Sequence, residues 1–215
     1  MSRALIFVNG RIPDLELVRR LIRTGDTILA ADGGTRLVLS LGLAPSVIIG
    51  DLDSLTDNDR RELDMAGTEI QRYPRDKNET DFELALHYTA EAGYREILIV
   101  AALGNRLDQT LGNLALLTDP SLAGLDVRVD DGVEQAYFVR TQTQVEGRPC
   151  DLVSLIPWGG EVTGVATVGL RWPLRGETLY PYQTRGISNE ILGETASVSL
   201  KSGLLLVVHS RFRQS

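Results

Sequence analysis

The first part of the chain alternates between short apolar runs and segments with the spacing of amphipathic helices. The segment 14–23 shows the helical spacing well, because four apolar side chains fall on one face: Leu15, Val18, Leu21 and Ile22. The apolar runs occupy residues 4–8, 27–31, 47–49, 68–72, 97–101 and 126–129. Strands that alternate with helices predict parallel βαβ units and a sheet covered by helices.

Two further patterns extend this prediction along the chain. Thr80 followed by Glu83 is the capping-box pattern of a helix start, and residues 108–118 form another helical stretch. After about residue 134, short runs rich in Val, Thr, Leu and Tyr replace the helical patterns, at residues 151–156, 161–166, 177–180, 196–200 and 204–209. Such runs, punctuated by Gly and Pro, predict an all-β sandwich or barrel. We therefore expect an α/β domain over residues 1–133 and a β domain over residues 134–215.

Composition narrows the class of protein. The 215 residues are 43% hydrophobic, which is enough for a buried core, and the net charge of −7 argues against a nucleic-acid-binding surface. No apolar run approaches the roughly 18 residues of a membrane span, and the N-terminal apolar stretch is too short for a signal peptide. Cys150 is the only cysteine, so no intrachain disulfide can form, and the presence of only two well-separated histidines, His87 and His209, argues against a structural zinc site. We expect a cytoplasmic protein without a nucleic-acid or membrane partner.

Polar and glycine residues follow three of the apolar runs. They are Asp32-Gly33-Gly34, Gly50-Asp51-Leu52-Asp53-Ser54 and the segment from Gly104 to Asp108. Ligands of parallel α/β sheets bind at the carboxyl ends of the strands, so these side chains are expected to gather at one edge.

Two aspartates of the second segment suggest a cation site. Asp51 and Asp53 point the same way in an extended segment, and Mg²⁺ prefers such carboxylates together with substrate phosphates. The alternative is that Asp53 caps the next helix while Asp51 is solvated. Asp81, at a helix start, is either a third acidic ligand or a carboxylate stabilised by the helix dipole.

Phosphate binding has candidates of its own. Gly33 and Gly34 precede the helical stretch 35–41 and would let the backbone approach a phosphate, although a tight turn also explains them. Arg106 can hold phosphate oxygens bidentately, or form a surface ion pair with Asp108. Neither a G-x-x-x-x-G-K-[ST] loop nor a G-x-G-x-x-G fingerprint occurs, so a nucleotide would be held by another arrangement.

Five short motifs in order resemble the thiamine pyrophosphokinase family. They are Ala-Asp-Gly-Gly at residues 31–34, Gly-Asp-Leu-Asp-Ser at 50–54, Lys-x-x-Thr-Asp at 77–81, Gly-x-Arg-Leu-Asp-Gln at 104–109 and Gly-Ile-Ser-Asn at 186–189. The resemblance implies a Rossmann-like, parallel-sheet α/β catalytic domain that binds the nucleotide, followed by a β-sandwich domain that binds thiamine. It also implies a homodimer with the active site at the subunit interface.

The resemblance further implies roles for individual residues. Asp51, Asp53 and Asp81 would organise Mg²⁺ and the phosphates of ATP, and Arg106, Gly33 and Gly34 would contact the nucleotide. Asp32, Lys77 and Asp108 would line the site, and Ser188 and Asn189 would help to hold the pyrimidine end of thiamine. Asn78 and Asn105 depart from the Asp and Gly usual in the family. Trp158 and Trp172 are candidates for stacking on thiamine, but we expect each to pack in the core.

The predicted reaction is transfer of pyrophosphate from ATP to the hydroxyl of thiamine, giving thiamine diphosphate and AMP, with Asp81 or Asp51 as proton acceptor. Two alternatives stay open. One is a phosphatase of the haloacid dehalogenase type, with Asp51 as nucleophile and Asp130-Asp131 as a distal acidic pair. The other is a non-catalytic module that binds thiamine or a nucleotide.

Overall fold

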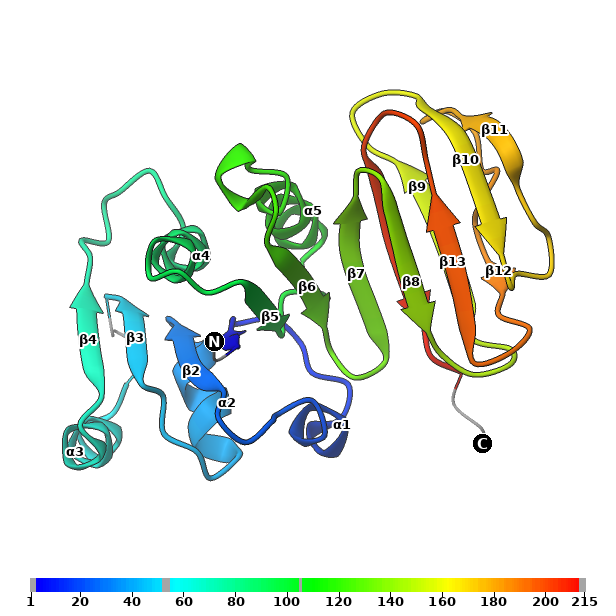
Figure 1. Cartoon of the computed structure of the whole chain (residues 1–215). Helices are drawn as coiled ribbons and strands as arrows, with labels where there is room; N and C mark the ends of the chain where they lie inside the picture. Colours follow the sequence, from blue (N-terminus) through cyan, green and yellow to red (C-terminus); the bar gives the residue numbers. More distant parts are fainter. Residues whose placement is uncertain (1–2, 52–54, 105, 213–215) are drawn as a thin grey trace. The chain divides into compact units, whose positions relative to one another are not determined.

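The chain divides into two compact units, residues 1–132 and 133–215 (Figure 1). The computed structural model describes residues 3–51, 55–104 and 106–212. The sequence placed the boundary between residues 133 and 134, one residue after the division that the structure makes.

Unit 1 is an α/β domain built on a parallel sheet. Its strands are β1 (Ala4–Phe7), β2 (Thr27–Ala31), β3 (Val47–Gly50), β4 (Glu69–Arg72), β5 (Glu96–Val100) and β6 (Asp126–Asp130). Their order is β6-β5-β1-β2-β3-β4, and each neighbouring pair is parallel. The predicted βαβ architecture is therefore confirmed. Because β1 lies between β2 and β5, the loops that follow β1 and β5 meet where the winding of the sheet reverses.

Helices cover both faces of this sheet (Figure 1). On one face lie α1 (Leu15–Arg19), α2 (Gly34–Ser40) and α3 (Asp57–Ala66), and on the other α4 (Asp81–Glu91) and α5 (Leu107–Leu116). A short 3₁₀ turn, η1 (Pro120–Leu122), precedes β6. Alternate strand residues such as Leu5 and Phe7 pack with Val18, Val38 and Leu63 in the core beneath the first three helices. Both faces are thus buried, as parallel sheets require.

Local helix signals proved partly correct. Thr80 caps α4 as predicted, since its hydroxyl accepts a hydrogen bond from the Glu83 N–H at 3.1 Å. The helix expected over residues 14–23 is shorter, because α1 ends at Arg19. Leu21 and Ile22 lie in the turn after α1 and still pack against the core. Their apolar spacing therefore reported burial correctly but did not mark the end of the helix. The helix α3 was not predicted.

Unit 2 is a β-sandwich. One antiparallel set, in the order β12-β9-β14-β7, comprises β7 (Glu134–Val139), β9 (Leu152–Pro157), β12 (Asn189–Glu190) and β14 (Leu205–Ser210). The other, β11-β10-β13-β8, comprises β8 (Gln142–Glu146), β10 (Val162–Val168), β11 (Arg175–Leu179) and β13 (Thr195–Ser199). The sandwich prediction is confirmed, although β7, β8 and β12 were not anticipated.

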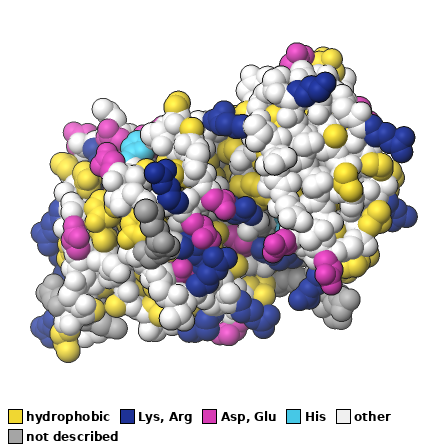
Figure 2. Space-filling view, viewed as in Figure 1, with side chains coloured by type: hydrophobic (Ala, Val, Ile, Leu, Met, Phe, Trp, Pro, Cys, Tyr) yellow, Lys and Arg dark blue, Asp and Glu magenta, His cyan; other side chains and the backbone are white. Residues whose placement is uncertain are grey.

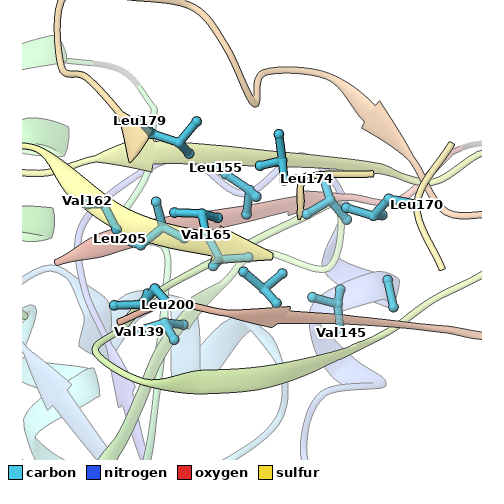
Figure 3. Packing of buried hydrophobic residues seen from close by; sticks show 14 of the residues in the cluster. Val139, Val145, Leu155, Val162, Val165, Leu170, Leu174, Leu179, Leu200 and Leu205 are labelled. Carbon is cyan, nitrogen blue, oxygen red and sulfur yellow. The ribbon is translucent and has the colours of Figure 1, made fainter. Parts of the chain in front are cut away.

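The core of unit 2 draws on both sheets (Figure 3). Leu155 and Leu205 come from one sheet and Val145, Val165 and Leu179 from the other, and each is almost fully buried. Residues at alternate positions of a strand face the same side, so these apolar residues form the inner layer while their neighbours face outward.

A buried polar pair also fastens unit 2. The Asp151 carboxylate lies 2.9 Å from His209 Nε2 and accepts backbone N–H bonds from Phe212 at 2.8 Å and Arg148 at 3.0 Å. Burial opposes ionisation, but the hydrogen bonds from Phe212, His209 and Arg148 outweigh it and hold the pKa of Asp151 below its ordinary value. Asp151 thereby joins the start of β9 to the end of β14.

Charged side chains of both signs are interspersed on the face shown in Figure 2. No helix within the described part of the chain has the length and apolar character needed to cross a bilayer.

Candidate functional site

A cavity of about 430 Å³ lies at the carboxyl ends of the strands of unit 1. Its size falls within the range of small-molecule sites, roughly 300–1,000 Å³. The loops after β1 to β5 and the first turns of α4 and α5 supply the lining: Val8, Asn9, Gly10, Ala31, Asp32, Asp51, Arg75, Lys77, Glu79, Thr80, Asp81, Phe82, Ala102, Gly104, Arg106, Gln109 and Asn113. The structure thus brings Asp32, Asp51, Lys77, Asp81 and Arg106 around one space, as the sequence predicted.

The chain turns sharply as it leaves three of these strands. Asp32 (φ 45°), Gly50 (φ 146°) and Ala101 (φ 60°) have positive φ where β2, β3 and β5 end. At Gly50 a side chain would be strained by the positive φ and would crowd Asp81, because a Cβ would lie 3.1 Å from Asp81 Oδ2. Glycine at this position therefore lets the Asp81 carboxylate approach the backbone beside Asp51.

Asp81 and Lys77 form an ion pair inside the cavity. Lys77 Nζ lies 2.8 Å from Asp81 Oδ1, and the two side chains are 14% and 18% exposed. The ammonium also donates a hydrogen bond to the Pro74 carbonyl at 3.1 Å. Asp81 Oδ1 is buried and accepts no well-aligned hydrogen bond within the described part of the chain, so its charge is balanced mainly by Lys77.

The expected metal site is described only in part. Asp51 is half-buried and lines the cavity, whereas Asp53 lies outside the described residues. Among the residues that are described, no three His, Cys, Asp or Glu side chains form a metal-binding group. The donors present nevertheless suit a hard cation, because Asp51 and Asp81 offer carboxylate oxygens and one of these is buried without an aligned hydrogen-bond donor.

Arg106 forms the surface ion pair that the sequence left open. Its Nε donates to Asp108 Oδ1 at 3.1 Å, and Nη2 donates to Oδ2. The hydrogen bond from Arg106 lowers the pKa of Asp108, and the hydrogen bond to Asp108 raises the pKa of Arg106. Both side chains are about two-thirds exposed, and Arg106 lines the cavity while Asp108 does not. The pair therefore holds the guanidinium at the rim, oriented by its partner.

Gly33 and Gly34 serve close packing at the start of α2. A Cβ at Gly34 would lie 2.1 Å from the Phe7 carbonyl oxygen, and one at Gly33 would lie 2.5 Å from Asn9 Cγ. Glycine at both positions lets α2 sit tightly against the end of β1. Contact with a phosphate stays a prediction for both.

Ser188 and Asn189 belong to unit 2. Ser188 is exposed with φ 55°, and its N–H donates to Ser154 Oγ at 3.0 Å. Asn189 is only 4% exposed, and its amide is engaged with Trp172: Oδ1 accepts the Trp172 N–H at 3.0 Å and Nδ2 donates to the Trp172 carbonyl at 2.7 Å. Asn189 therefore holds the backbone of Trp172.

The expectation that both tryptophans pack in the core was wrong for Trp172. Its side chain is 51% exposed, with the Arg171 guanidinium 5.2 Å from the ring centroid. Trp158 is half-buried and makes an edge contact with Phe138 at 5.3 Å. The pattern of apolar residues did not predict that Trp172 is more exposed than Trp158, because Trp172 lies in the connection between β10 and β11. The alternation of inward- and outward-facing positions applies only within a strand.

The sequence analysis did not identify several of the lining residues, among them the polar residues Asn9, Arg75 and Asn113. Asn113 is 8% exposed, and its Nδ2 donates to the Ala102 carbonyl at 2.8 Å, which holds the loop after β5. A signal existed for it, because Arg106, Gln109 and Asn113 recur at the spacing of one helical face.

The topology disfavours the phosphatase alternative. Asp130 and Asp131 follow β6, and neither lines the cavity that contains Asp51. Three strands, β5, β1 and β2, separate β6 from β3. At about 4.8 Å per strand, the acidic pair lies roughly 19 Å from Asp51, too far to share its chemistry.

Comparisons with known proteins agree with this arrangement. The family model "Thiamin pyrophosphokinase, catalytic domain" matches residues 18–129, and "Thiamin pyrophosphokinase, vitamin B1 binding domain" matches residues 140–205. A relative from Bacillus subtilis (strain 168) described as thiamine pyrophosphokinase is 28% identical over 184 residues, covering 85% of this chain and 86% of the relative.

Solved structures show the same fold. The thiamine pyrophosphokinase structure from Bacillus subtilis superposes with a TM-score of 0.88 at 24% identity, covering 99% of this chain and 100% of the other. The one from Geobacillus thermodenitrificans gives a TM-score of 0.85 at 24% identity, covering 100% and 99%. Since the first family model alone spans more than half of the chain, the chain belongs to the thiamin pyrophosphokinase family, enzymes that form thiamine diphosphate from thiamine.

Proposed function

We propose that this protein transfers the pyrophosphoryl group of ATP to the hydroxyl of thiamine with Mg²⁺, giving thiamine diphosphate and AMP. One observation carries the proposal: the carboxylates Asp32, Asp51 and Asp81 and the cations Lys77 and Arg106 line a single cavity at the carboxyl edge of the sheet. A triphosphate with its counter-cation needs such a mixture of charges.

The residues divide the work by charge. Asp51 and Asp81, with Asp53 as a third candidate, would hold Mg²⁺, which when bound neutralises the phosphates and the charge that develops on them. The ammonium of Lys77 would leave the Asp81 carboxylate and pair with a phosphate oxygen, and the guanidinium of Arg106 would bind phosphate at the rim of the cavity. Asp32, Gly33, Gly34 and Asp108 complete the proposed nucleotide site.

Group transfer requires one proton acceptor. The hydroxyl oxygen of thiamine bonds to the β-phosphorus while the bond from that phosphorus to the bridging oxygen of AMP breaks. AMP leaves with the electron pair, and the hydroxyl proton passes to a carboxylate, for which Asp81 and Asp51 are our candidates. Holding the hydroxyl in line with the leaving group supplies much of the acceleration.

Unit 2 would bind the thiamine ring. Trp172 is 51% exposed with the Arg171 guanidinium over its ring, and exposed aromatic rings can stack on flat heterocycles. Ser188 presents an exposed hydroxyl, while Asn189 keeps Trp172 in place. The proposed phosphate residues lie in unit 1 and the proposed thiamine residues in unit 2. The homodimer with its active site at the subunit interface is a proposal that follows from the family resemblance. Light scattering of the purified protein tests the dimer, and cell fractionation tests the proposed cytoplasmic location.

The reaction is tested by incubating purified protein with thiamine, ATP and Mg²⁺ and separating the products by chromatography. Equal amounts of AMP and thiamine diphosphate support the proposal. Inorganic phosphate without thiamine diphosphate would indicate a phosphatase. Ligand binding with no product would leave a binding module and refute the proposed reaction.

A further inference from the structure

Arg171 lies over the aromatic ring of Trp172 in unit 2. The Cζ atom of its guanidinium is 5.2 Å from the centroid of the indole ring. At this distance a cation is attracted by the negative face of an aromatic ring. Trp172 is nevertheless 51% exposed, so a flat ligand can stack on the part of the indole that the guanidinium leaves open.

Two contacts with Glu190 fix this arrangement. Arg171 Nη1 donates a hydrogen bond to Glu190 Oε2 at 2.7 Å, and the Arg171 N–H donates to the Glu190 carbonyl oxygen at 2.9 Å. The hydrogen bond to Glu190 also raises the pKa of Arg171, so the guanidinium stays charged. Asn189, the preceding residue, holds the backbone of Trp172. The cation and the indole are therefore placed by the same short strand, β12.

Thiamine offers two flat rings of different charge. Its aminopyrimidine ring is uncharged at neutral pH, whereas its thiazolium ring carries a permanent positive charge and the hydroxyethyl group. A thiazolium ring stacked on the indole would lie about 10 Å from the guanidinium carbon, since stacked ring centroids are roughly 5 Å apart. Coulomb's law, with an effective dielectric constant between about 20 and 80, makes this stack about 2- to 15-fold less favourable than the stack of an uncharged ring.

We infer that Arg171 determines which ring of thiamine stacks on Trp172: it disfavours the thiazolium ring and thereby directs the aminopyrimidine ring to the indole. The selection matters for the reaction because the hydroxyl is attached to the thiazolium ring. In the reverse orientation, the hydroxyl takes the place of the pyrimidine and no alcohol faces the phosphates of the donor. Arg171 is thus a positioning residue that acts through Trp172. The inference rests on the proposed function, because it assumes that unit 2 binds thiamine.

Calorimetric binding of thiamine and of an uncharged isostere tests the inference without turnover. In the isostere a thiophene ring replaces the thiazolium ring, so the shape is kept and the charge is removed. Arg171→Gln should bind thiamine about three- to tenfold more tightly than wild type, while the affinity for the isostere changes by less than about twofold. Arg171→Lys keeps the charge and should restore the wild-type affinity for thiamine. Unchanged or weaker thiamine binding in a folded Arg171→Gln variant, or an equal gain for both ligands, would overturn the inference.

Arg185→Gln is the matched control. Arg185 is 55% exposed and pairs with Glu177 Oε1 at 3.5 Å, much as Arg171 is 56% exposed and pairs with Glu190. The control removes one positive charge from the surface of unit 2 and should leave the affinity for thiamine within about twofold of wild type. Equal tightening in the two variants would show a general effect of net charge and refute a role specific to Arg171.

Steady-state kinetics separates a change of orientation from a structural effect. Reversed thiamine occupies the site without reacting, so Arg171→Gln should lower kcat and KM for thiamine by the same factor, about three- to tenfold, with kcat/KM within about twofold of wild type. A raised KM with a lowered kcat/KM would indicate loss of structure and contradict the inference. If the wild-type protein forms no thiamine diphosphate, the proposed reaction is refuted, while calorimetry with thiamine and its isostere still decides the role of Arg171.

Discussion

Asn189 is expected to act on thiamine through Trp172 rather than by direct contact. Its side chain is 4% exposed and holds both the N–H and the carbonyl of Trp172, at 3.0 and 2.7 Å. In Asn189→Ala these two backbone groups lose their partners, and the exposed indole loses its fixed position. The variant should therefore bind thiamine weakly while the phosphate chemistry in unit 1 is unaffected.

The size of the effect follows from the two lost hydrogen bonds. Leaving one buried polar group without its partner costs about 1–3 kcal/mol. Two groups lose their partners here, but water can reach the half-exposed Trp172 and replace part of the lost hydrogen bonding. The total cost to the loop conformation is therefore about 1.5–3 kcal/mol. Each 1.4 kcal/mol corresponds to about a tenfold change in the population of the binding-competent loop. KM for thiamine should rise about 10- to 100-fold, with kcat within about threefold of wild type.

Steady-state kinetics with thiamine as the varied substrate measures the effect, and a double-mutant cycle shows its route. If Asn189 acts through Trp172, Asn189→Ala should raise KM little further in a Trp172→Ala background. Glu190→Gln serves as the control, because Glu190 makes a surface ion pair with Arg171 and its loss should have a small effect. Additive effects of Asn189→Ala and Trp172→Ala on KM would refute the positioning role.

Three further predictions concern the site and its scaffold. Asp51→Asn should lower kcat by about 10²-fold or more with an unchanged melting temperature, and normal turnover would contradict the proposed cation role. Gly10→Ala should destabilise unit 1 by about 1–3 kcal/mol in urea unfolding, because its Cβ would lie 2.1 Å from the Ala101 carbonyl oxygen; an unchanged midpoint would show that the loop relaxes. The lowered pKa of Asp151 stabilises the fold above its unfolded pKa of about 3.9, and that stability is lost as the pH falls through the folded pKa. Asp151→Asn should therefore unfold with a flatter pH dependence below about pH 4, whereas a parallel acid limb would contradict the assignment.

Much of the fold was accessible from the sequence because its signals are local. The run at residues 27–31 coincides with β2, and Thr80 caps α4 as its side-chain chemistry predicts. Parallel strands place their carboxyl ends at one edge, so the alternation of strands and helices was enough to expect Asp32, Asp51 and Arg106 at that edge. Asp81 was joined to them by the family resemblance.

The pattern of apolar and polar residues does not predict the order of the strands or the contacts between loops. Nothing in the local pattern places β1 between β2 and β5, yet this order brings Asn9 beside Gly33 and Asn113 beneath Ala102. The structure likewise assigns the amide of Asn189 to Trp172, 17 residues away, where the family resemblance had suggested thiamine.

The difference between what the sequence determined and what only the tertiary structure decided has a physical reason. Helix caps, apolar periodicity and strand-end carboxylates depend on neighbours within a turn or a strand, so the sequence by itself determined the fold class and the charged edge of the sheet. The adjacency of strands, the burial of Asn189 and the exposure of Trp172 depend on how distant segments share hydrogen bonds and exclude water. These features were decided only by the tertiary structure.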